Sequence, residues 1–393
     1  MSRAAALVVC IKECRESLRD RRVLINVLLV GPLLGPLLFV ILLRLTVARQ
    51  IEQAARPLPV AVAGAQYAPN LVAALEQQGL QRLPAPADLE AAVRSQQLDL
   101  ALRIPPGFSA AWSAGHPAQL ELVYDSSRQG ALAQVQRLQT MLESYAQRNA
   151  ALRLMARGLS PTLAVPLVIA GRDQATPQSR GALMFAMLPY FLVLTALIGG
   201  MWLAIDSTAG ERERNSLEPL LINPVPRDQI LLGKVLATSL FSFASLTLGL
   251  LAFMVAGWFL PAEQMGLSFS LGPRVIGTIL PVMLPLVLLI AIVQILVTAF
   301  ARSAREAQTH LGLVQLLPIV PSVALSLMPV KFALWMYAIP LLGQQLIILR
   351  LLRGESVAVL PETLTAVVTL LAALLAFLGA HRSYASERLA VSG

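Results

Sequence analysis

The chain has 393 residues, of which 56% are apolar and only 13% are charged, and its mean hydropathy is +0.68. This composition excludes a soluble enzyme of that size and indicates an integral membrane protein. The net charge of +9 does not indicate nucleic-acid binding, because the sequence has no basic stripe with interleaved aromatic residues.

Residues 1–22 are predicted to form an amphipathic helix, an elbow that lies on the cytoplasmic membrane surface. Its apolar side is formed by Leu7, Ile11, Cys14 and Leu18, and its polar side by Lys12, Glu13, Glu16, Arg19 and Asp20. Cys10 and Cys14 are interpreted as reduced structural thiols rather than a metal pair. The apolar run that follows is longer than the core of a signal peptide, which has roughly 7 to 15 residues, so we expect a retained anchor.

Six apolar segments approach or exceed the roughly 20 residues that cross a bilayer as a helix. They are residues 23–48, 181–206, 235–260, 275–301, 311–328 and 364–380. A seventh apolar segment, 332–352, contains Pro340, Gly343 and two glutamines, and is predicted to re-enter the membrane or lie at its surface within residues 331–356.

The first span contains Gly31-Pro32 and Gly35-Pro36, and each proline is expected to kink the helix by removing a backbone hydrogen bond. A bend of this kind serves either packing or the lining of a transport pathway, and the sequence leaves both interpretations open. Candidate pathway-lining residues are Asn26, Pro32, Pro36, Gln294 and Gln315. Arg44 lies near the outer end of this span, where its side chain reaches the interface.

Basic residues in short loops predict the orientation, because Lys and Arg are retained on the cytoplasmic side. With six spans, the termini and short loops on one side carry fourteen Lys and Arg, and the short loops on the other side carry four. We therefore expect both termini and the loop 206–234 to be cytoplasmic, in a multi-pass protein of the cell (inner) membrane. Residues 49–180, between the first and second spans, are then external.

The external region 49–180 has no spanning segment and alternates predicted strands with predicted helices. The expected strands are 58–63, 98–104 and 119–124, and the expected helices are 69–78, 87–95 and 127–157. These features predict an α-helical membrane protein with a soluble α/β domain between spans 1 and 2, followed by spans 2–6 within residues 181–393.

A charged hinge joins the second and third spans over residues 206–234. Ser216 is placed to cap a short helix whose first turn holds Glu218 and Pro219, where a carboxylate and a proline are both favoured. Leu217, Leu220 and Leu221 then give the helix an apolar face. The pattern predicts a rigid helical peg on a cytoplasmic hinge.

At this hinge the chain resembles the permease subunits of ABC type-2 exporters, whose coupling helix docks onto a separate ATPase. The matching positions are Asp206, Gly210, Glu211, Arg212, Glu213, Ser216, Leu217, Glu218, Leu220, Leu221, Pro224, Val225, Arg227, Gly233 and Lys234. Asn215 and Ser216 stand where glycine and threonine are usual, and both keep turn and capping chemistry. Residues 12–22 and 31–34 look like the elbow helix and first span of the sodium-export (NatB-like) type, and residues 60–64, 104–108 and 124–125 are similar to its external domain.

The resemblance implies a permease that pairs with a second copy and with an ABC ATP-binding subunit, which supplies ATP and Mg. Consistent with this, the chain has no Gly-x-x-x-x-Gly-Lys-Ser/Thr phosphate loop, so we expect no cofactor, no catalytic residue and no metal ligand here. In the implied mechanism, the leucines of the peg fill a groove on the ATPase while Glu211, Glu213 and Glu218 orient it. The type implies sodium efflux, but a lipid, drug or peptide suits the apolar interior equally well.

The residues bear on three other functional classes. A proton- or sodium-driven secondary transporter normally buries carboxylates at mid-membrane, and this sequence places none there. An enzyme is disfavoured because His116, His310 and His381 have neither metal nor triad spacing. A membrane sensor that uses the external domain as a receptor stays open as an alternative.

Overall fold

The computed structural model describes residues 3–164, 176, 187–214, 225–259, 271–327 and 332–385. The chain divides into two compact units, one formed by Met1–Thr46 with Gln174–Gly393 and the other by Val47–Asp173. They are called the membrane unit and the α/β unit below, and each is described by itself.

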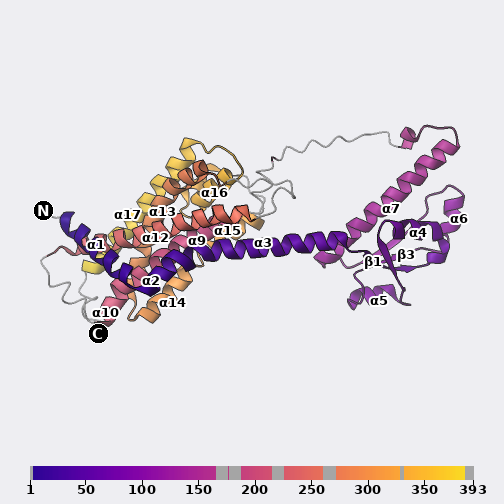
Figure 1. The fold of residues 1–393 in the computed structure, drawn as a ribbon. Coiled ribbons are helices and arrows are strands. Elements are labelled where there is room, and N and C mark those ends of the chain that lie inside the picture. Colours follow the sequence, from indigo (N-terminus) through magenta and orange to yellow (C-terminus); the bar gives the residue numbers. More distant parts are fainter. Residues whose placement is uncertain are drawn as a thin grey trace. The chain divides into compact units, whose positions relative to one another are not determined.

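The membrane unit is a bundle of helices (Figure 1). Its elements are α1 Arg3–Arg19, α2 Arg21–Ile25, η1 Asn26–Val30, α3 Gly31–Ala55, α9 Leu188–Ile205, η4 Asp206–Gly210, α10 Glu211–Glu213, α12 Arg227–Trp258, α13 Pro273–Phe300, α14 Ala304–Val314, α15 Ile319–Leu327, η6 Leu334–Ala338, α16 Leu342–Leu352 and α17 Val359–Ala385. α3 continues past Thr46, so the boundary between the units lies within this helix.

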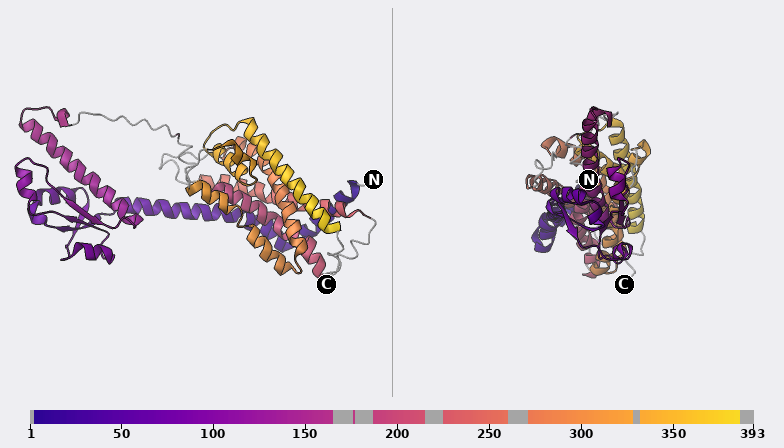
Figure 2. Two further views of the ribbon diagram at one scale, coloured as in Figure 1. Left: turned by 180° about the vertical axis from the view of Figure 1, so that it is seen from behind. Right: turned by 90° about the vertical axis from the view of Figure 1, so that its right-hand side faces the viewer.

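Among the described residues, six helical segments have the length and composition to cross a membrane, which confirms the six predicted spans. They are Val23–Leu45, Leu188–Glu213, Arg227–Trp258, Pro273–Phe300, Ala304–Leu325 and Val359–Arg382. α1 and the C-terminal part of α17 lie at the same end of the membrane unit (Figures 1 and 2). That arrangement agrees with an even number of spans.

Two apolar segments depart from a simple spanning helix. The fifth span is broken into α14 and α15 by a turn that ends at Pro318, which has no N–H to continue the helical ladder. The seventh apolar segment forms the short 3₁₀ helix η6 and the 11-residue α16. A helix of that length rises only about 16 Å, roughly half of a hydrocarbon core.

Small residues allow the helices of the membrane unit to approach closely. On α9, a Cβ added to Gly199 would lie 2.4 Å from Ser245 Cβ, and one added to Gly200 would lie 2.3 Å from Ser242 Oγ. Both serines belong to α12. Because lipid tails do not drive apolar helices together, close backbone packing of this kind holds α9 against α12.

The first span also packs through glycines. A Cβ at Gly31 would lie 2.8 Å from Ser245 Oγ, and one at Gly35 would lie 3.1 Å from Phe191 Cβ. Thr195 Oγ1 donates a hydrogen bond to the Gly31 carbonyl at 3.2 Å. The helical ladder changes just before the Gly-Pro pairs, where η1 is a π-helical turn. α3 continues from Gly31 to Ala55 with Pro36 inside it, and the kinks expected at Pro32 and Pro36 stay a prediction.

The α/β unit contains a four-stranded sheet in the order β2-β1-β3-β4. The strands are β1 Leu58–Ala63, β2 Leu80–Leu83, β3 Leu100–Arg103 and β4 Glu121–Tyr124, and the helices are α4 Pro69–Gln77, α5 Leu89–Arg94, α6 Phe108–Ser113 and α7 Gln129–Ala156. β1 is parallel to β2 and β3, whereas β4 runs antiparallel to β3. β2 and α6 were not predicted from the sequence.

The core of the α/β unit lies between the sheet and its helices. Val60 and Leu102 of the two central strands are fully buried, together with Leu75 of α4 and Leu138 of α7. Alternation of apolar residues along β1 and the helical spacing of apolar residues on α7 bring these side chains to one face. Trp112 of α6 extends this core by stacking on Phe108 and Tyr145.

Candidate functional site

The hinge begins with a change in helix geometry at the end of α9. Residues Asp206–Gly210 form the π-helical turn η4, and Thr208 Oγ1 donates to the Ala204 carbonyl at 2.6 Å. π turns occur frequently at functional sites because they release carbonyl groups from the regular ladder. Here the carbonyl of Ser207 accepts a hydrogen bond from the side chain of Lys234, on the next span.

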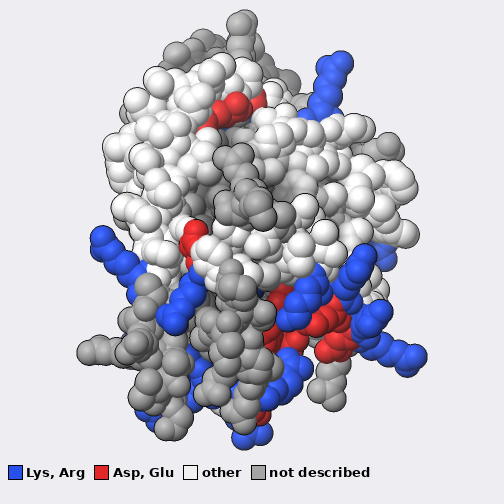
Figure 3. All heavy atoms as spheres, turned by 90° about the vertical axis from the view of Figure 1, so that its left-hand side faces the viewer, with Lys and Arg blue, Asp and Glu red and all other residues white. Residues whose placement is uncertain are grey.

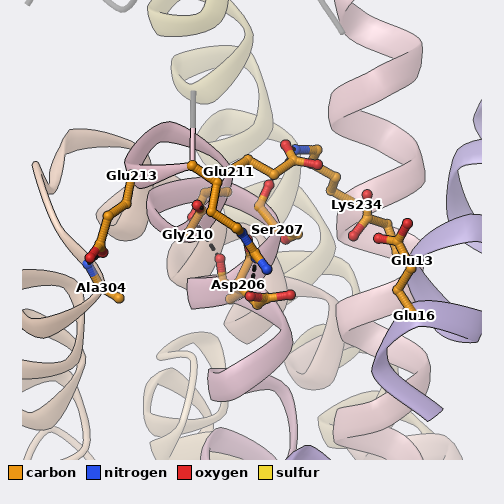
Figure 4. Close-up of polar contacts among 12 residues, drawn as sticks. Glu13, Glu16, Asp206, Ser207, Gly210, Glu211, Glu213, Lys234 and Ala304 are labelled. Atoms are coloured by element: carbon orange, nitrogen blue, oxygen red, sulfur yellow. Dashed lines mark hydrogen bonds and ion pairs between the residues drawn. The ribbon is translucent and has the colours of Figure 1, made fainter. Parts of the chain in front are cut away.

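Lys234 forms a buried ion pair with Glu211. Its side chain is 1% exposed and that of Glu211 is 9% exposed, and Lys234 Nζ contacts Glu211 Oε2 directly. Figure 4 shows Lys234 on α12 next to Glu211 at the start of α10. Removing one member of such a buried pair leaves an uncompensated charge, so the two residues stabilise each other's position.

The N-terminal helix completes this cluster of charges. Lys12 Nζ lies 3.2 Å from Glu211 Oε1, 3.3 Å from Glu13 Oε1 and 3.5 Å from Glu16 Oε2. The charge cluster is therefore Lys12, Glu13, Glu16, Glu211 and Lys234, and it joins α1, α10 and α12. It contains three carboxylates and two ammonium groups.

Glu13 faces the protein rather than water. It is 4% exposed, whereas Leu7, Ile11 and Leu18 are 58%, 43% and 55% exposed. α1 thus turns these three apolar side chains outward and packs Glu13 against the bundle, whereas the sequence placed Glu13 on the polar side of a surface helix. Burial raises the pKa of the Glu13 carboxyl above its usual value, and the ammonium groups of Lys234 and Lys12 offset part of this rise.

The two cysteines of α1 also lie against the bundle. Cys10 and Cys14 are free thiols that pack beside Val23, Trp202 and Phe241. Burial raises the pKa of Cys14 to about 11, which keeps the thiol neutral and unreactive at physiological pH.

Gly233 explains how α1 comes close enough to α12 for these contacts. A Cβ at Gly233 would lie 2.7 Å from the Ala6 carbonyl oxygen and 2.7 Å from Val9 Cβ, both on α1. Any side chain larger than hydrogen would therefore push the helices apart. In the hinge motif, Gly233 allows α1 to approach α12 closely, and the next residue, Lys234, supplies the buried ammonium group.

The other side of the hinge contacts the ends of two further helices. The guanidinium of Arg212 donates to the carbonyls of Ala299 and Ala301 at 2.9 and 3.0 Å, at the C-terminus of α13. Glu213 Oε2 accepts a hydrogen bond from the backbone N–H of Ala304 at 3.2 Å, at the N-terminus of α14. Each charge meets the helix end that its sign favours. Figure 4 shows Glu213 directed to Ala304, on the side away from α1.

Short-range contacts stabilise the hinge itself. The guanidinium of Arg214 pairs with the Asp206 carboxylate and donates to the Gly210 carbonyl at 3.2 Å. Arg227 begins α12 at the other end of the hinge. Ser216, Leu217, Glu218, Leu220, Leu221 and Pro224, which form the predicted peg, lie outside the described residues.

The structure thus brings Glu211 and Lys234 together. It also surrounds them with partners that were not predicted from the sequence. Lys12 and Glu211 are 199 positions apart, and no local pattern indicates a contact at that separation. The buried face of α1 mixes the polar residues Glu13 and Ser17 with Ala6, so its residue pattern gives no signal of these partners.

The residues considered for a transport pathway take part in internal packing. Gln294 is 1% exposed and its Nε2 donates to the Leu197 carbonyl at 2.6 Å. Gln315 Nε2 lies 3.1 Å from Met201 Sδ, one turn further along α9. Pro32 and Pro36 are buried, and Asn26 is half-buried. Pathway lining by these residues stays a prediction.

The end of the membrane unit that carries α1 and α10 is strongly charged on its surface. Figure 3 shows acidic side chains with Lys and Arg around them on one half of this face, while the other half is mostly uncharged. A surface with this density of charge is disfavoured next to lipid tails.

A helical bundle with six candidate spans among the described residues, a charged hinge after the second of them and an α/β unit between the first two define a multi-pass membrane protein. The family model described as "ABC-2 family transporter protein" matches residues 24–380, and the chain belongs to this family. It is 28% identical over 348 residues to the ABC transporter permease protein NatB of Bacillus subtilis (strain 168), and the match covers 87% of this chain and 88% of that protein.

Proposed function

We propose that the chain is the permease subunit of an exporter in which a separate subunit hydrolyses ATP and this chain moves the cargo across the cell (inner) membrane. Membership of the ABC-2 transporter family supports an ATP-binding partner. The excess of basic residues on the side of the hinge supports cytoplasmic termini, because Lys and Arg are retained there. A second copy of the chain completes the proposed permease.

The observation that carries the proposal is the way the hinge is tied to the bundle. Glu211 contacts α1 and α12, while Arg212 and Glu213 contact the ends of α13 and α14. A force applied to the loop between α10 and α12 therefore acts on four helices together. In the proposed mechanism the ATPase applies this force to the peg around Ser216–Leu221.

The peg is tested by replacing Leu220 and Leu221 with aspartate and purifying the variant with its ATPase subunit. The proposal predicts loss of ATPase association with normal membrane insertion. The matched control places the same substitution at Leu159 and Leu163, which are 46% and 62% exposed in the α/β unit, and it should retain the ATPase. Association of the Leu220→Asp/Leu221→Asp variant with an active ATPase would contradict the peg assignment.

Two cargo classes fit the proposed function. Sodium follows from the sodium-export type that the sequence resembles, and its oxygen ligands would include backbone carbonyls. A lipid, drug or peptide suits an interior in which the buried polar residues of the described spans are mainly Ser, Thr and Gln. Reconstitution of both subunits in vesicles separates the two classes, since ATP would drive either ²²Na⁺ flux or movement of a fluorescent amphiphile.

A further inference from the structure

Two arginines form a cluster at the end of the membrane unit opposite the charge cluster. Arg350 lies in the last turn of α16 and Arg353 caps it. Leu352, between them, packs with Leu271 and Ile279 at the start of α13. The charge cluster, in contrast, lies near Ala299 and Ala301 at the end of α13. The arginines are therefore separated from the hinge by the length of a span.

Aromatic rings hold both guanidinium groups in place. Arg350 Cζ lies 5.3 Å from the ring centre of Phe332 and 5.5 Å from that of Tyr337. Arg353 Cζ lies 5.3 Å from the same Phe332 ring. Cation–π contacts attract the charge but leave the N–H groups at the edge of the guanidinium free to donate. The two arginines are thus preorganised on one shared platform.

Within the described residues, these donors are not all used. Glu355 is the nearest acidic partner, at 3.8 Å from Arg350 Nε and 4.0 Å from Arg353 Nη1. Both distances exceed those of a hydrogen bond. Within the described part of the chain, Arg350 Nε has no hydrogen-bond partner, and neither has the buried hydroxyl of Tyr337. Two arginines facing one glutamate leave a net charge of one positive.

The surroundings of this cluster are those of a membrane surface. Trp335, two residues before Tyr337, is 62% exposed, and Trp258 at the end of α12 is 77% exposed. Tryptophan is enriched at the level of lipid headgroups. Leu334, Val359 and Leu360 are 50%, 74% and 61% exposed, and they offer apolar surface next to the charged groups. The arginine side chains are 24% and 29% exposed, so an anion reaches them.

We propose that Arg350 and Arg353 bind the phosphate of an anionic lipid headgroup, with Phe332 as their platform and the exposed leucines and valine against the acyl chains. A phosphodiester carries one negative charge and accepts the planar, bidentate hydrogen bonds that guanidinium groups donate. It would neutralise the excess charge and satisfy the donors that Glu355 does not reach. A free phosphate ion shares this chemistry but makes no use of the apolar surface.

The test is a titration of the purified full-length chain with phosphatidylglycerol in detergent, followed by native mass spectrometry. Replacing both arginines with glutamine should weaken lipid binding at this site by about tenfold or more, since two charge-assisted interactions are lost. The control is Arg274→Gln, an exposed arginine at the start of α13, on the same side of the membrane unit. It should bind phosphatidylglycerol as the wild type does.

A variant that binds phosphatidylglycerol more tightly excludes misfolding as the cause of a change in binding. Glu355→Gln removes the competing carboxylate and should tighten phosphatidylglycerol binding, an effect that loss of structure does not produce. Diacylglycerol, which lacks the phosphate, should show no preference between wild type and variants. Equal binding of phosphatidylglycerol to the wild type and the double glutamine variant would overturn the site. Displacement of the lipid by inorganic phosphate at comparable concentration would overturn the assignment to a lipid.

Discussion

Two networks of ion pairs in this chain have similar chemistry and opposite environments. In the membrane unit, Lys234 and Glu211 are almost fully buried. In the α/β unit, Arg103 of β3 makes contacts of 2.7 and 2.9 Å with Glu90 and Glu121, and all three side chains are 37% to 55% exposed. The ion pairs of both networks are short. The networks differ in how far their side chains are exposed to water.

The difference decides what each network contributes. Hydrogen bonds from Arg103 hold the pKa of Glu90 below its usual range, yet water and salt screen an exposed pair, and its loss is readily compensated by solvent. A buried pair has no such replacement, because breaking it leaves one charge without water or partner. The charge cluster is therefore suited to holding helices in one arrangement, and the surface network is not.

The largest expected effect is at the buried pair. Glu211→Gln should lower the free energy of unfolding by about 3–5 kcal/mol, because Lys234 remains buried without its carboxylate. Adding Lys234→Met should recover much of the loss, since both charges are then absent. Chemical unfolding of the purified chain in detergent measures the double-mutant cycle. Strictly additive losses would show that the two side chains do not interact.

A smaller effect is expected where α1 approaches α12. Gly233→Ala should destabilise by about 1–3 kcal/mol, because its Cβ meets α1 at 2.7 Å and forces the helices apart. Gly277→Ala in α13 is the control, as no atom lies within 4 Å of its added Cβ. It should be neutral or stabilising, since alanine favours a helix more than glycine does. Equal destabilisation of the two variants would contradict the close contact.

A pH dependence should distinguish Glu13 from the exposed carboxylates. Because burial raises its pKa in the folded chain, the folded state binds a proton that the unfolded state has already lost. Stability contributed by this carboxyl is thus present at low pH and is lost as pH rises from the ordinary glutamate pKa of about 4.3 through the folded value. Glu13→Gln should flatten that part of the stability curve, and an unchanged slope would contradict the burial of Glu13.

The smallest effect is expected in the surface network. Arg103→Ala should change hydrogen exchange of the β3 and β4 amides by less than about threefold, because solvent replaces the lost partners of Glu90 and Glu121. Asp88→Ala gives a positive control in the same unit. Asp88 Oδ1 caps α5 by accepting from the Ala91 N–H at 2.8 Å, and its loss should expose the α5 amides measurably more.

Local patterns predicted the elements that depend on local forces. β1 occupies residues 58–63 as expected, because β-favouring residues alternate there between turn signals. β2 was missed because Gln81 and Arg82 leave it without an apolar alternation, and only its pairing with β1 makes it a strand. The hinge motif identified Glu211 and Lys234 but not Lys12, the second ion-pair partner of Glu211.

The position of Glu13 could not be predicted by ordinary amphipathic reasoning. A helix on a soluble protein buries its apolar side, whereas α1 exposes Leu7, Ile11 and Leu18, which suits a helix at a membrane surface. Its protein-facing side combines Glu13 and Ser17 with Ala6. Contacts between distant segments decide this arrangement, and they become visible only when α1 and α12 are placed together.

We expect the buried charge cluster to make α1 and α12 move as one body when the proposed ATPase partner acts on the hinge. Spin labels at Leu18 and Leu236, both exposed, allow the distance between the two helices to be measured by pulsed electron spin resonance in the assembled complex. The wild type should give one narrow distance distribution that is the same with and without ATP, and Glu211→Gln should give a broad one. A wild-type distance that shifts with ATP would contradict this rigid coupling of α1 to α12.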